Sequence, residues 1–314
     1  MAEPGPVDFL VVGESLVDIV DDAAEEPDTH PGGGPMNVAY GLGLLARTVI
    51  LVTELGDDAH GAVVRDHLAT ANVMVPDVSC EHGTSRAWAT VDSSGSASYA
   101  FDIRWELRGV PDIGAPQHVH VGSVAAFVEP GAAAVREVVE RFRGSSTVSF
   151  DPNVRPALLG AREEARERAE WLVSRSDVVK ASDEDLRWLY PDDEALAVAR
   201  RWLGRGPALV VVTKGHEGVV AVTGHGAVEV AAVPATVADT VGAGDSFMSA
   251  LLDGLSAARL LGVGGRARLR DRSPEGVRAV LERAARAAAI TVARPGAHPP
   301  DLAELGGLVA ERSV

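Results

Sequence analysis

Short apolar runs that alternate with longer helical patterns constrain the fold of this 314-residue chain more than any other feature. The runs are unbroken by alternating polar residues, so both faces of each predicted strand are expected to be buried. Strands of this kind, separated by helices, are typical of a mostly parallel sheet with right-handed crossovers. The predicted strands cover residues 9–12, 49–52, 119–121, 147–150, 177–179 and 209–212. The expected fold class is therefore α/β, with helices on both faces of a central, mostly parallel sheet.

The intervening helices are predicted from their apolar periodicity and their start signals. They cover about 35–46, 61–71, 130–142, 161–173, 194–203, 246–255 and 274–292. Residues 262–272 are predicted to be a surface loop, and a hairpin is expected from 219–222 and 227–232. No repeat or low-complexity linker divides the chain, so one domain covering residues 1–314 is expected.

Two stretches depart from this alternation. Residues 86–92 and 97–103 flank a Ser- and Gly-rich turn, which predicts a hairpin. A further short strand is predicted near 16–20. Together, strands at about 15–20 and 85–104 form either a small lid inserted in the domain or a plain edge hairpin. An open hairpin edge also predicts a homodimer, because free strand edges tend to be covered.

Composition excludes several classes of protein. A net charge of −16, with 46% hydrophobic and 24% charged residues, argues against a nucleic-acid partner. No apolar run is long enough to span a membrane, and the acidic N-terminus is unlike a signal peptide. The lone cysteine, Cys80, allows no intramolecular disulfide. These features predict a soluble cytoplasmic protein with no membrane partner.

The segment Asp239–Phe247 is a glycine turn that leads into a helix. Small residues at Gly242, Ala243 and Gly244 leave backbone N–H groups open at a helix N-terminus, where the helix dipole attracts anions. A carboxylate at Asp245 competes with an anion unless it removes a proton from a hydroxyl beside that anion. The turn therefore predicts either phosphoryl transfer to an alcohol or an ordinary helix start with an acidic first turn.

A second glycine segment covers residues 32–39, with the sequence G-G-G-P-M-N-V-A. Its glycines permit close backbone approach, and the Asn37 amide can donate and accept hydrogen bonds. Neither G-x-G-x-x-G nor a Walker A sequence occurs. The segment fits a loop that binds sugar hydroxyls, and it also fits a simple helix start.

Taken together, these strings resemble the ribokinase-like (pfkB) carbohydrate kinases. D-T-V-G-A-G-D-S-F at 239–247 is similar to the family's C-terminal signature, D-T-x-G-A-G-D-x-F, at every fixed position. Residues 32–39 resemble the family's G-G-x-x-x-N-x-A, and 56–61 resemble its G-x-D-x-x-G. Similar segments run from near residue 8 to near residue 300. The resemblance implies a ribokinase-like fold and an ATP- and Mg²⁺-dependent sugar kinase.

The resemblance also assigns roles to individual residues. Asp245 would be the catalytic base and the turn Gly242–Gly244 the anion hole. Arg155, in D-P-N-V-R at 151–155, would approach the transferring phosphate or the substrate, with Asn153 supporting it. The residues expected to bind sugar hydroxyls are Asp18, Gly33 and Asn37.

The nucleotide side is expected from other segments. T-K-G-H-E-G at 213–218 is similar to the family's T-x-G-x-x-G, so Thr213, Gly215 and Gly218 would lie along ATP. The segment at 180–185, beginning with Lys180, occupies the place of the family's N-x-x-E motif but carries S-x-x-D. Asp185 or Glu184 would then help to hold Mg²⁺. By analogy with relatives, Asp239 would lie near a site for a monovalent cation such as K⁺.

The expected substrate is a sugar with a primary hydroxyl, and the segments together look most like bacterial fructokinases. Arg104 lies at a position where fructokinase-like sequences usually have a small or neutral residue. It would instead bind a substrate carboxylate, as in 2-keto-3-deoxygluconate kinases, and Arg86 is a second candidate for this role. A ribokinase or nucleoside kinase is a third alternative. A non-catalytic sugar- or nucleotide-binding regulator on the same fold is the alternative from another class.

Overall fold

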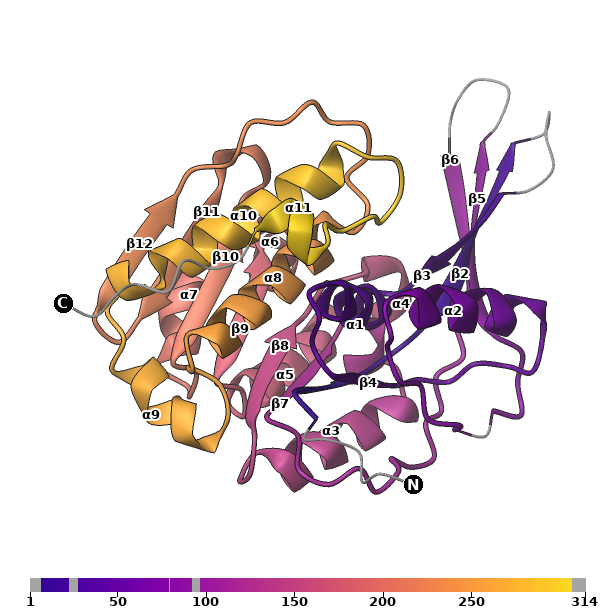
Figure 1. The fold of residues 1–314 in the computed structure, drawn as a ribbon, viewed down its shortest axis with the longest axis horizontal. Coiled ribbons are helices and arrows are strands. Elements are labelled where there is room, and N and C mark those ends of the chain that lie inside the picture. Colours follow the sequence, from indigo (N-terminus) through magenta and orange to yellow (C-terminus); the bar gives the residue numbers. More distant parts are fainter. Residues whose placement is uncertain (1–6, 23–27, 79, 92–96, 307–314) are drawn as a thin grey trace.

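A long, mostly parallel sheet forms the centre of the computed structural model, which describes residues 7–22, 28–78, 80–91 and 97–306 (Figure 1). Within these residues the sheet has eight strands in the order β12-β11-β10-β9-β8-β7-β1-β4. Strands β10 to β4 run parallel, and β11 and β12 form an antiparallel hairpin at one edge. The strands are β1 (Phe9–Val12), β4 (Val49–Val52), β7 (His118–Gly122), β8 (Thr147–Asp151), β9 (Val178–Ser182), β10 (Leu209–Thr213), β11 (Val219–Thr223) and β12 (Gly226–Val230).

Helices cover both faces of this sheet, as the buried strands require. One core packs α1, α8 and α10 on side chains such as Val11, and the other packs α3, α5 and α7 on side chains such as Val12. The helices are α1 (Gly34–Leu44), α2 (Ala59–Thr70), α3 (Gly131–Phe142), α4 (Pro156–Leu159), α5 (Arg162–Val173), α6 (Asp183–Leu189), α7 (Ala195–Leu203), α8 (Ala243–Ala257), α9 (Val263–Arg270), α10 (Arg278–Val292) and α11 (Leu302–Leu305). Short 3-10 turns are η1 (Val124–Ala126), η2 (Gly215–Glu217) and η3 (Glu275–Val277). Among the described residues, no helix has the length and apolar character needed to cross a membrane.

A second, smaller sheet projects from the main body beside α2 (Figure 1). Its strand order is β3-β2-β5-β6, with β2 and β5 parallel and the outer pairs antiparallel. The strands are β2 (Leu16–Asp22), β3 (Asp28–Gly32), β5 (Ser85–Val91) and β6 (Ala97–Asp102). The expected strand near 16–20 and the expected hairpin are both present. The predicted turn at 93–96 lies outside the described residues.

Strand β3 is absent from the sequence-based prediction, because D-T-H-P-G contains residue types that are depleted in strands. It lies at an edge of the small sheet, where a proline removes no ladder hydrogen bond from the interior. Pairing with β2 therefore decides this strand.

The loop predicted at 262–272 is wrong, because α9 occupies Val263–Arg270. Its glycines and arginines give little local preference for a helix. Contacts with the rest of the protein stabilise it instead. Leu269 is fully buried, and the Arg266 guanidinium donates to the Asp177 carboxylate over 2.7 Å. The C-terminal helix also begins later than predicted, after the 3-10 turn η3.

Candidate active site

The glycine turn at 239–247 places Asp245 in the first turn of α8. Gly242 is the N-cap with φ +73°, and a Cβ atom there would lie 2.5 Å from the Cβ of Ala297. Only glycine fits this position without strain. The Ala243 N–H makes a long bond, 3.4 Å, to the Thr240 carbonyl, whereas the Gly244 N–H has no acceptor within the described part of the chain. This helix start therefore presents open N–H groups and the positive end of the helix dipole.

Asp245 is buried, and its Oδ2 accepts a hydrogen bond from Asn37 Nδ2 over 2.9 Å. Burial raises the pKa of the Asp245 carboxyl, while the Asn37 bond and the charges of Lys180 and Arg155 act in the opposite direction. Asn37 was predicted to bind sugar hydroxyls. Its recorded contact is with the predicted base, so it holds that carboxylate in one orientation.

Lys180 brings a positive charge to the same turn. Its Nζ donates to Asp151 Oδ2 over 2.8 Å, and both side chains are buried. A Cβ atom at Gly244 would lie 3.0 Å from this Nζ, so the absence of a side chain at Gly244 lets the ammonium group approach α8. Burial alone would lower the pKa of Lys180, but Asp151, Asp185 and Asp245 together raise it, so the ammonium stays charged. Burial raises the pKa of Asp151 to about 6, even with Lys180 beside it.

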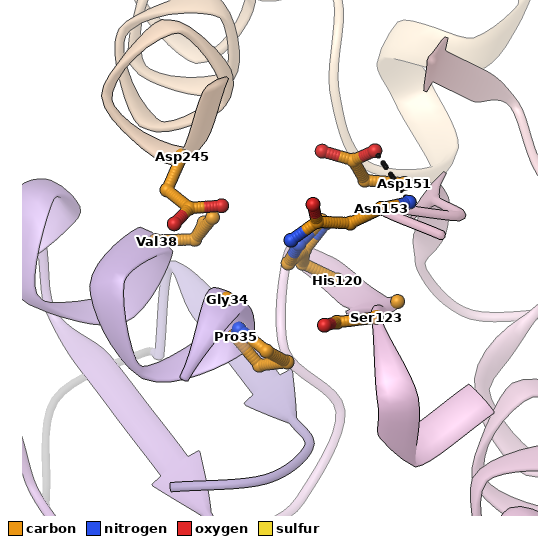
Figure 2. Close-up of a pocket in the computed structure, with 9 residues that line it drawn as sticks. Gly34, Pro35, Val38, His120, Ser123, Asp151, Asn153 and Asp245 are labelled. Carbon is orange, nitrogen blue, oxygen red and sulfur yellow. Dashed lines mark hydrogen bonds between the residues drawn. The ribbon is translucent and has the colours of Figure 1, made fainter. Parts of the chain in front are cut away.

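A small pocket separates the start of α8 from the ends of β7 and β8 (Figure 2). The Asp245 carboxylate reaches it from one side, and Asn153 and His120 reach it from the other. A Cβ atom at Gly34 would lie 2.6 Å from Asn153 Nδ2, so glycine is needed for this close approach. The lining residues are Gly34, Pro35, Val38, His120, Gly122, Ser123, Asp151, Asn153 and Asp245.

Arg155 follows β8 and keeps its charge free of carboxylate partners within the described residues. Its Nη1 donates to Asn153 Oδ1 over 2.8 Å and to the Asn153 and Val154 carbonyls. These acceptors are neutral, so the guanidinium can still attract an anion. Burial raises the pKa of Asp18 and of Asp245, and the charge of Arg155 acts against both increases. Arg155 therefore connects, electrostatically, two residues predicted from distant parts of the sequence.

Asp18 and Gly33 do not line the pocket of Figure 2. Asp18 lies over the chain at Gly32, where a Cβ atom would be 2.2 Å from its Oδ2. Burial raises the pKa of Asp18, although His30 and Arg155 lower it. Gly33 has φ +113°, and a Cβ atom there would lie 2.6 Å from the Glu14 carbonyl. Both glycines are therefore required by close packing, whatever they bind.

The predicted nucleotide segment follows β10, next to the end of β9. Thr213 pairs in register with Ser182, and its hydroxyl is 3.5 Å from the Ala181 carbonyl. Gly215 has φ +53° and open space around its Cβ direction, as a ligand-binding turn would need. Gly218 has φ +100°, and a Cβ atom there would lie 2.2 Å from the Val230 carbonyl, which is a structural reason for glycine.

Asp185, which was predicted to help to hold Mg²⁺, makes structural contacts at the start of α6. Its Oδ2 accepts from Ser182 N over 2.8 Å, closing a capping box at α6, and its Oδ1 accepts from Val154 N over 2.7 Å. The carboxylate thus ties the loop that carries Arg155 to α6. Glu184 is exposed. Within the described residues, no three His, Cys, Asp or Glu side chains are arranged to hold a metal ion together.

Asp239 connects the glycine turn to the C-terminal loop. Its Oδ1 accepts from Val241 N over 3.0 Å, and its Oδ2 accepts from Gly296 N over 2.9 Å. The Val241 N–H, with those of Gly296 and Thr240, holds the pKa of this carboxyl below its usual range. The bonds join Asp239, which was expected near a monovalent cation, to the C-terminal loop at Gly296.

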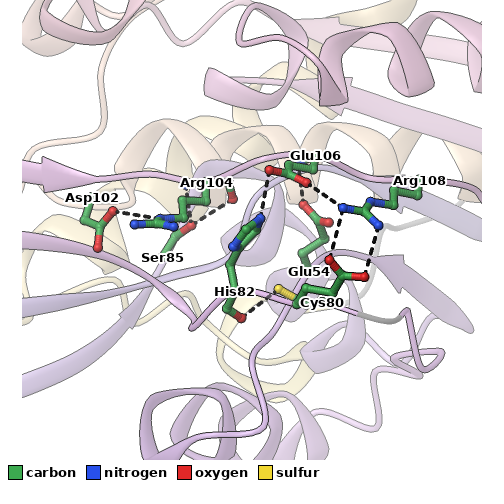
Figure 3. Close-up of polar contacts among 9 residues, drawn as sticks. Glu54, Cys80, His82, Ser85, Asp102, Arg104, Glu106 and Arg108 are labelled. Atoms are coloured by element: carbon green, nitrogen blue, oxygen red, sulfur yellow. Dashed lines mark hydrogen bonds and ion pairs between the residues drawn. The ribbon is translucent and has the colours of Figure 1, made fainter.

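Arg104 does not line the pocket, in contrast to its predicted place near the sugar. Its Nε is 3.3 Å from Asp102 Oδ1, and its side chain is 55% exposed (Figure 3). Arg86 donates to the other oxygen of Asp102 over 3.0 Å. Both predicted carboxylate readers are therefore already paired with a carboxylate of this chain.

Sequence reasoning missed two buried residues: Glu14, which is not part of the pocket lining, and His120, which is. Glu14 is 3% exposed, its Oε2 accepts from Ala125 N over 2.8 Å, and burial raises its pKa to about 7. His120 lines the pocket from β7. The signal for His120 was a polar residue within an otherwise apolar strand, which is costly unless it is bonded.

Comparisons with known proteins agree with this geometry. The family model described as pfkB family carbohydrate kinase matches residues 8–303. The fructokinase of Rhizobium leguminosarum bv. trifolii is 32% identical over 264 residues, which cover 81% of this chain and 81% of that protein. The fructokinase of Klebsiella pneumoniae is 31% identical over 257 residues, covering 79% and 84%.

Solved structures agree as well. The fructokinase from Xylella fastidiosa superposes with a TM-score of 0.80 at 26% identity, covering 95% of this chain and 97% of that chain. Aminoimidazole riboside kinase from Salmonella enterica, at 21% identity and a TM-score of 0.76, shares the fold. The predicted ribokinase-like fold, the family resemblance and the sugar-kinase class are confirmed. The chain belongs to the pfkB family of carbohydrate kinases.

Proposed function

We propose that this protein transfers the γ-phosphoryl group of ATP to the primary hydroxyl of fructose, giving fructose 6-phosphate. One observation carries the proposal: a buried carboxylate, Asp245, is oriented by Asn37 at a helix start that also holds the Lys180 ammonium. Asp245 also lines the small pocket beside this helix start, which supports a base, an alcohol site and an anion site in one place. The sequence similarity to relatives such as the Rhizobium leguminosarum fructokinase supports fructose as the acceptor.

In this proposal, Asp245 accepts the proton of the attacking hydroxyl. The open N–H groups of α8, with Lys180 and Arg155, stabilise negative charge on the transferring phosphoryl group. Such transfer depends mainly on positioning and electrostatics, so fixed donors in a buried site are effective. Asn37 keeps the base aligned, and Asn153 keeps Arg155 in place.

The residues present fit a bound nucleoside triphosphate. The Gly244 N–H and the Lys180 ammonium supply donors and positive charge for phosphate oxygens. The open turn at Gly215 follows β10, which is the strand next to β9. Mg²⁺ prefers phosphate oxygens and water over an all-protein cage. This preference is compatible with the described residues, in which no three His, Cys, Asp or Glu side chains are arranged to hold a metal ion together. When bound, the ion would neutralise charge on the phosphates.

The alternatives have less support. In a 2-keto-3-deoxygluconate kinase, Arg104 and Arg86 would bind the substrate carboxylate, but both already share Asp102. Arg155, which has no carboxylate partner among the described residues, is assigned here to the transferring phosphoryl group.

The small sheet is proposed to act as a lid that excludes water from the site. The cytoplasmic location, the homodimer and the cation near Asp239 stay predictions.

The test is turnover of ATP with fructose, ribose, ketodeoxygluconate and adenosine, measured side by side. We expect the highest kcat/KM with fructose. Asp245→Asn should keep ATP binding and thermal stability. Its rate of phosphoryl transfer should fall by about 10³-fold or more, because the positioned base is removed. Near wild-type turnover in that variant would rule out the assigned base.

A further inference from the structure

A stripe of buried polar side chains crosses the centre of the large sheet on the face covered by α8. In β7 and β8, His118 pairs in register with Thr147, and His120 pairs with Ser149. These four side chains are at most 1% exposed. On the same face, the neighbouring strands carry Phe9 and Val11 in β1 and Val178 in β9. Two buried imidazoles in an apolar core are costly unless their nitrogens are hydrogen-bonded.

All but one of these imidazole nitrogens have a recorded partner. His118 Nδ1 is 2.8 Å from Thr147 Oγ1, and His118 Nε2 is 2.7 Å from Ser149 Oγ. His120 Nδ1 is 2.9 Å from the same Ser149 Oγ. The Gly262 N–H donates to Thr147 Oγ1 over 2.9 Å and closes the far end of the chain of bonds. Within the described residues, no partner is recorded for His120 Nε2, and this ring lines the pocket with Asp245 (Figure 2).

The shared Ser149 hydroxyl links the tautomers of the two rings. Burial holds both imidazoles neutral, and it lowers the pKa of His120 to about 3. The hydroxyl has one proton, so it can donate to one ring and must accept from the other. If His118 carries its proton on Nδ1, His120 also carries its proton on Nδ1 and offers Nε2 as an acceptor. If both protons move to Nε2, the three bonds between the imidazoles and the hydroxyls reverse, and His120 offers a donor.

We propose that His120 Nε2 binds a hydroxyl group of the sugar acceptor and so helps to select the sugar. A hydroxyl both donates and accepts, so it satisfies either tautomer, whereas a methylene group satisfies neither. His120 approaches from β7 and Asp245 from α8, so the two groups can bind different hydroxyls of one sugar. His118, Ser149 and Thr147 are positioning residues, because they act on the sugar only through His120. This inference rests on the proposed function.

Two substitutions separate the two ends of the ring. The Asn amide reaches the position of Nδ1 and keeps a partner for Ser149, while the Gln amide reaches the position of Nε2 and keeps a group in the pocket. The measured quantity is kcat/KM for fructose, for its 1-, 3- and 4-deoxy analogues, and for 2,5-anhydromannitol, which lacks the C2 hydroxyl. Melting temperature and sugar-independent ATP hydrolysis report on folding and nucleotide binding.

For the wild-type protein, one analogue should lose about 10- to 100-fold in kcat/KM, because it leaves a buried nitrogen without a partner. His120→Asn should lose a similar factor with fructose and nothing further with that same analogue. His120→Gln should keep most of the wild-type discrimination. An equal loss by His120→Asn with every sugar would overturn the inference, since that result indicates packing alone.

A second measurement uses the unmodified sequence and does not depend on the variants folding. The ¹⁵N chemical shift of His120 Nε2 should change when fructose is added and should not change with the discriminating analogue. An Nε2 chemical shift that stays the same when fructose is added would overturn the inference. If the wild-type protein phosphorylates none of fructose, ribose, ketodeoxygluconate and adenosine, the proposed function would instead be overturned, and this is measured separately.

Discussion

Asp245 and Asn37 show how two single residues, 208 positions apart, make one chemical unit. Each could be predicted as a site residue from its own glycine segment. Their hydrogen bond could not, because it depends on α1 and α8 packing side by side on the same face of the sheet. The bond aligns the carboxylate and also adjusts its basicity.

Asn37→Ala should raise the pKa of Asp245, because the Asn37 donor stabilises the ionised carboxylate. The acidic limb of the profile of kcat/KM against pH should therefore move to higher pH. The measurement is kcat/KM for fructose between pH 5 and pH 9 in both proteins, with thermal melting as the control for folding. An unchanged acidic limb would show that this limb does not report Asp245.

Lys180 and Asp151 form a buried ion pair, and removing one partner leaves the other charge uncompensated. Lys180→Met should lower the free energy of unfolding by about 3–5 kcal/mol at pH 7. Asp151→Asn in the same chain should restore part of this loss, since the orphaned carboxylate is gone. Urea unfolding of the two single variants and the double variant measures the coupling, and strictly additive losses would contradict it.

At the scale of an element, the start of α2 explains the motif at 56–61. Asp58 is the N-cap: its Oδ1 accepts from Gly61 N over 2.8 Å, and its Oδ2 accepts from Thr84 N over 2.8 Å. A Cβ atom at Gly61 would lie 2.2 Å from the Gly56 carbonyl. The motif thus attaches α2 to the segment that leads into β5 and the small sheet, and its role is structural.

Asp58→Ala should lower the free energy of unfolding by about 1–2 kcal/mol at pH 7 through loss of the cap. Burial raises the pKa of Asp58, but its hydrogen bonds with Gly61 and Thr84 bring it below the ordinary value. The carboxylate therefore contributes stability above the unfolded-state pKa and loses it as the pH falls through the folded-state pKa. The difference between wild type and variant should shrink in acid.

Asp57→Ala is the matched control for this experiment, because Asp57 is the exposed neighbour in the same turn. Its unfolding free energy should stay within about 0.5 kcal/mol of the wild type. A loss for Asp57→Ala as large as that for Asp58→Ala would contradict the capping explanation.

At the scale of the whole molecule, the site makes the protein less stable at neutral pH. Glu14 has its pKa raised from 4.5 to about 7 by burial, and Asp151 has its pKa raised to about 6. A carboxyl with a raised folded-state pKa stabilises the fold when it is protonated. That stability is fully present below the unfolded-state pKa and is lost as the pH rises through the folded-state value.

Glu14→Gln should therefore stabilise the protein at pH 8 relative to wild type, by up to about 3 kcal/mol from the size of the shift. Near pH 4.5 the two proteins should be nearly equal. Urea unfolding at pH 4.5 and pH 8 measures the difference in unfolding free energy. Glu163→Gln, at an exposed position, is the control and should leave the unfolding free energy unchanged at both pH values. A Glu14→Gln variant that is less stable than wild type at pH 8 would contradict burial as the cause.

Local patterns account for how much of the fold could be predicted. The core strands are unbroken apolar runs and the main helices have clear periodicity, so β10 and α5 lie almost where the sequence predicts them. Strand β3 and helix α9 were missed, because their residue types favour neither state. Pairing with β2 stabilises β3, and the Arg266–Asp177 contact stabilises α9.

The α/β class, the family and the chemistry predicted for the glycine turn could be inferred from residues that are close together in the chain. The fold was needed to see that Asn37 bonds to Asp245, that Lys180 lies against Gly244, and that His120 ends a chain of buried hydrogen bonds at the pocket. The contacts of Asn37, Lys180 and His120 join segments that are far apart in the chain, so strand order and helix packing decide them rather than any local pattern. The Arg104–Asp102 pair is local in sequence, and only its absence from the pocket lining depends on the fold.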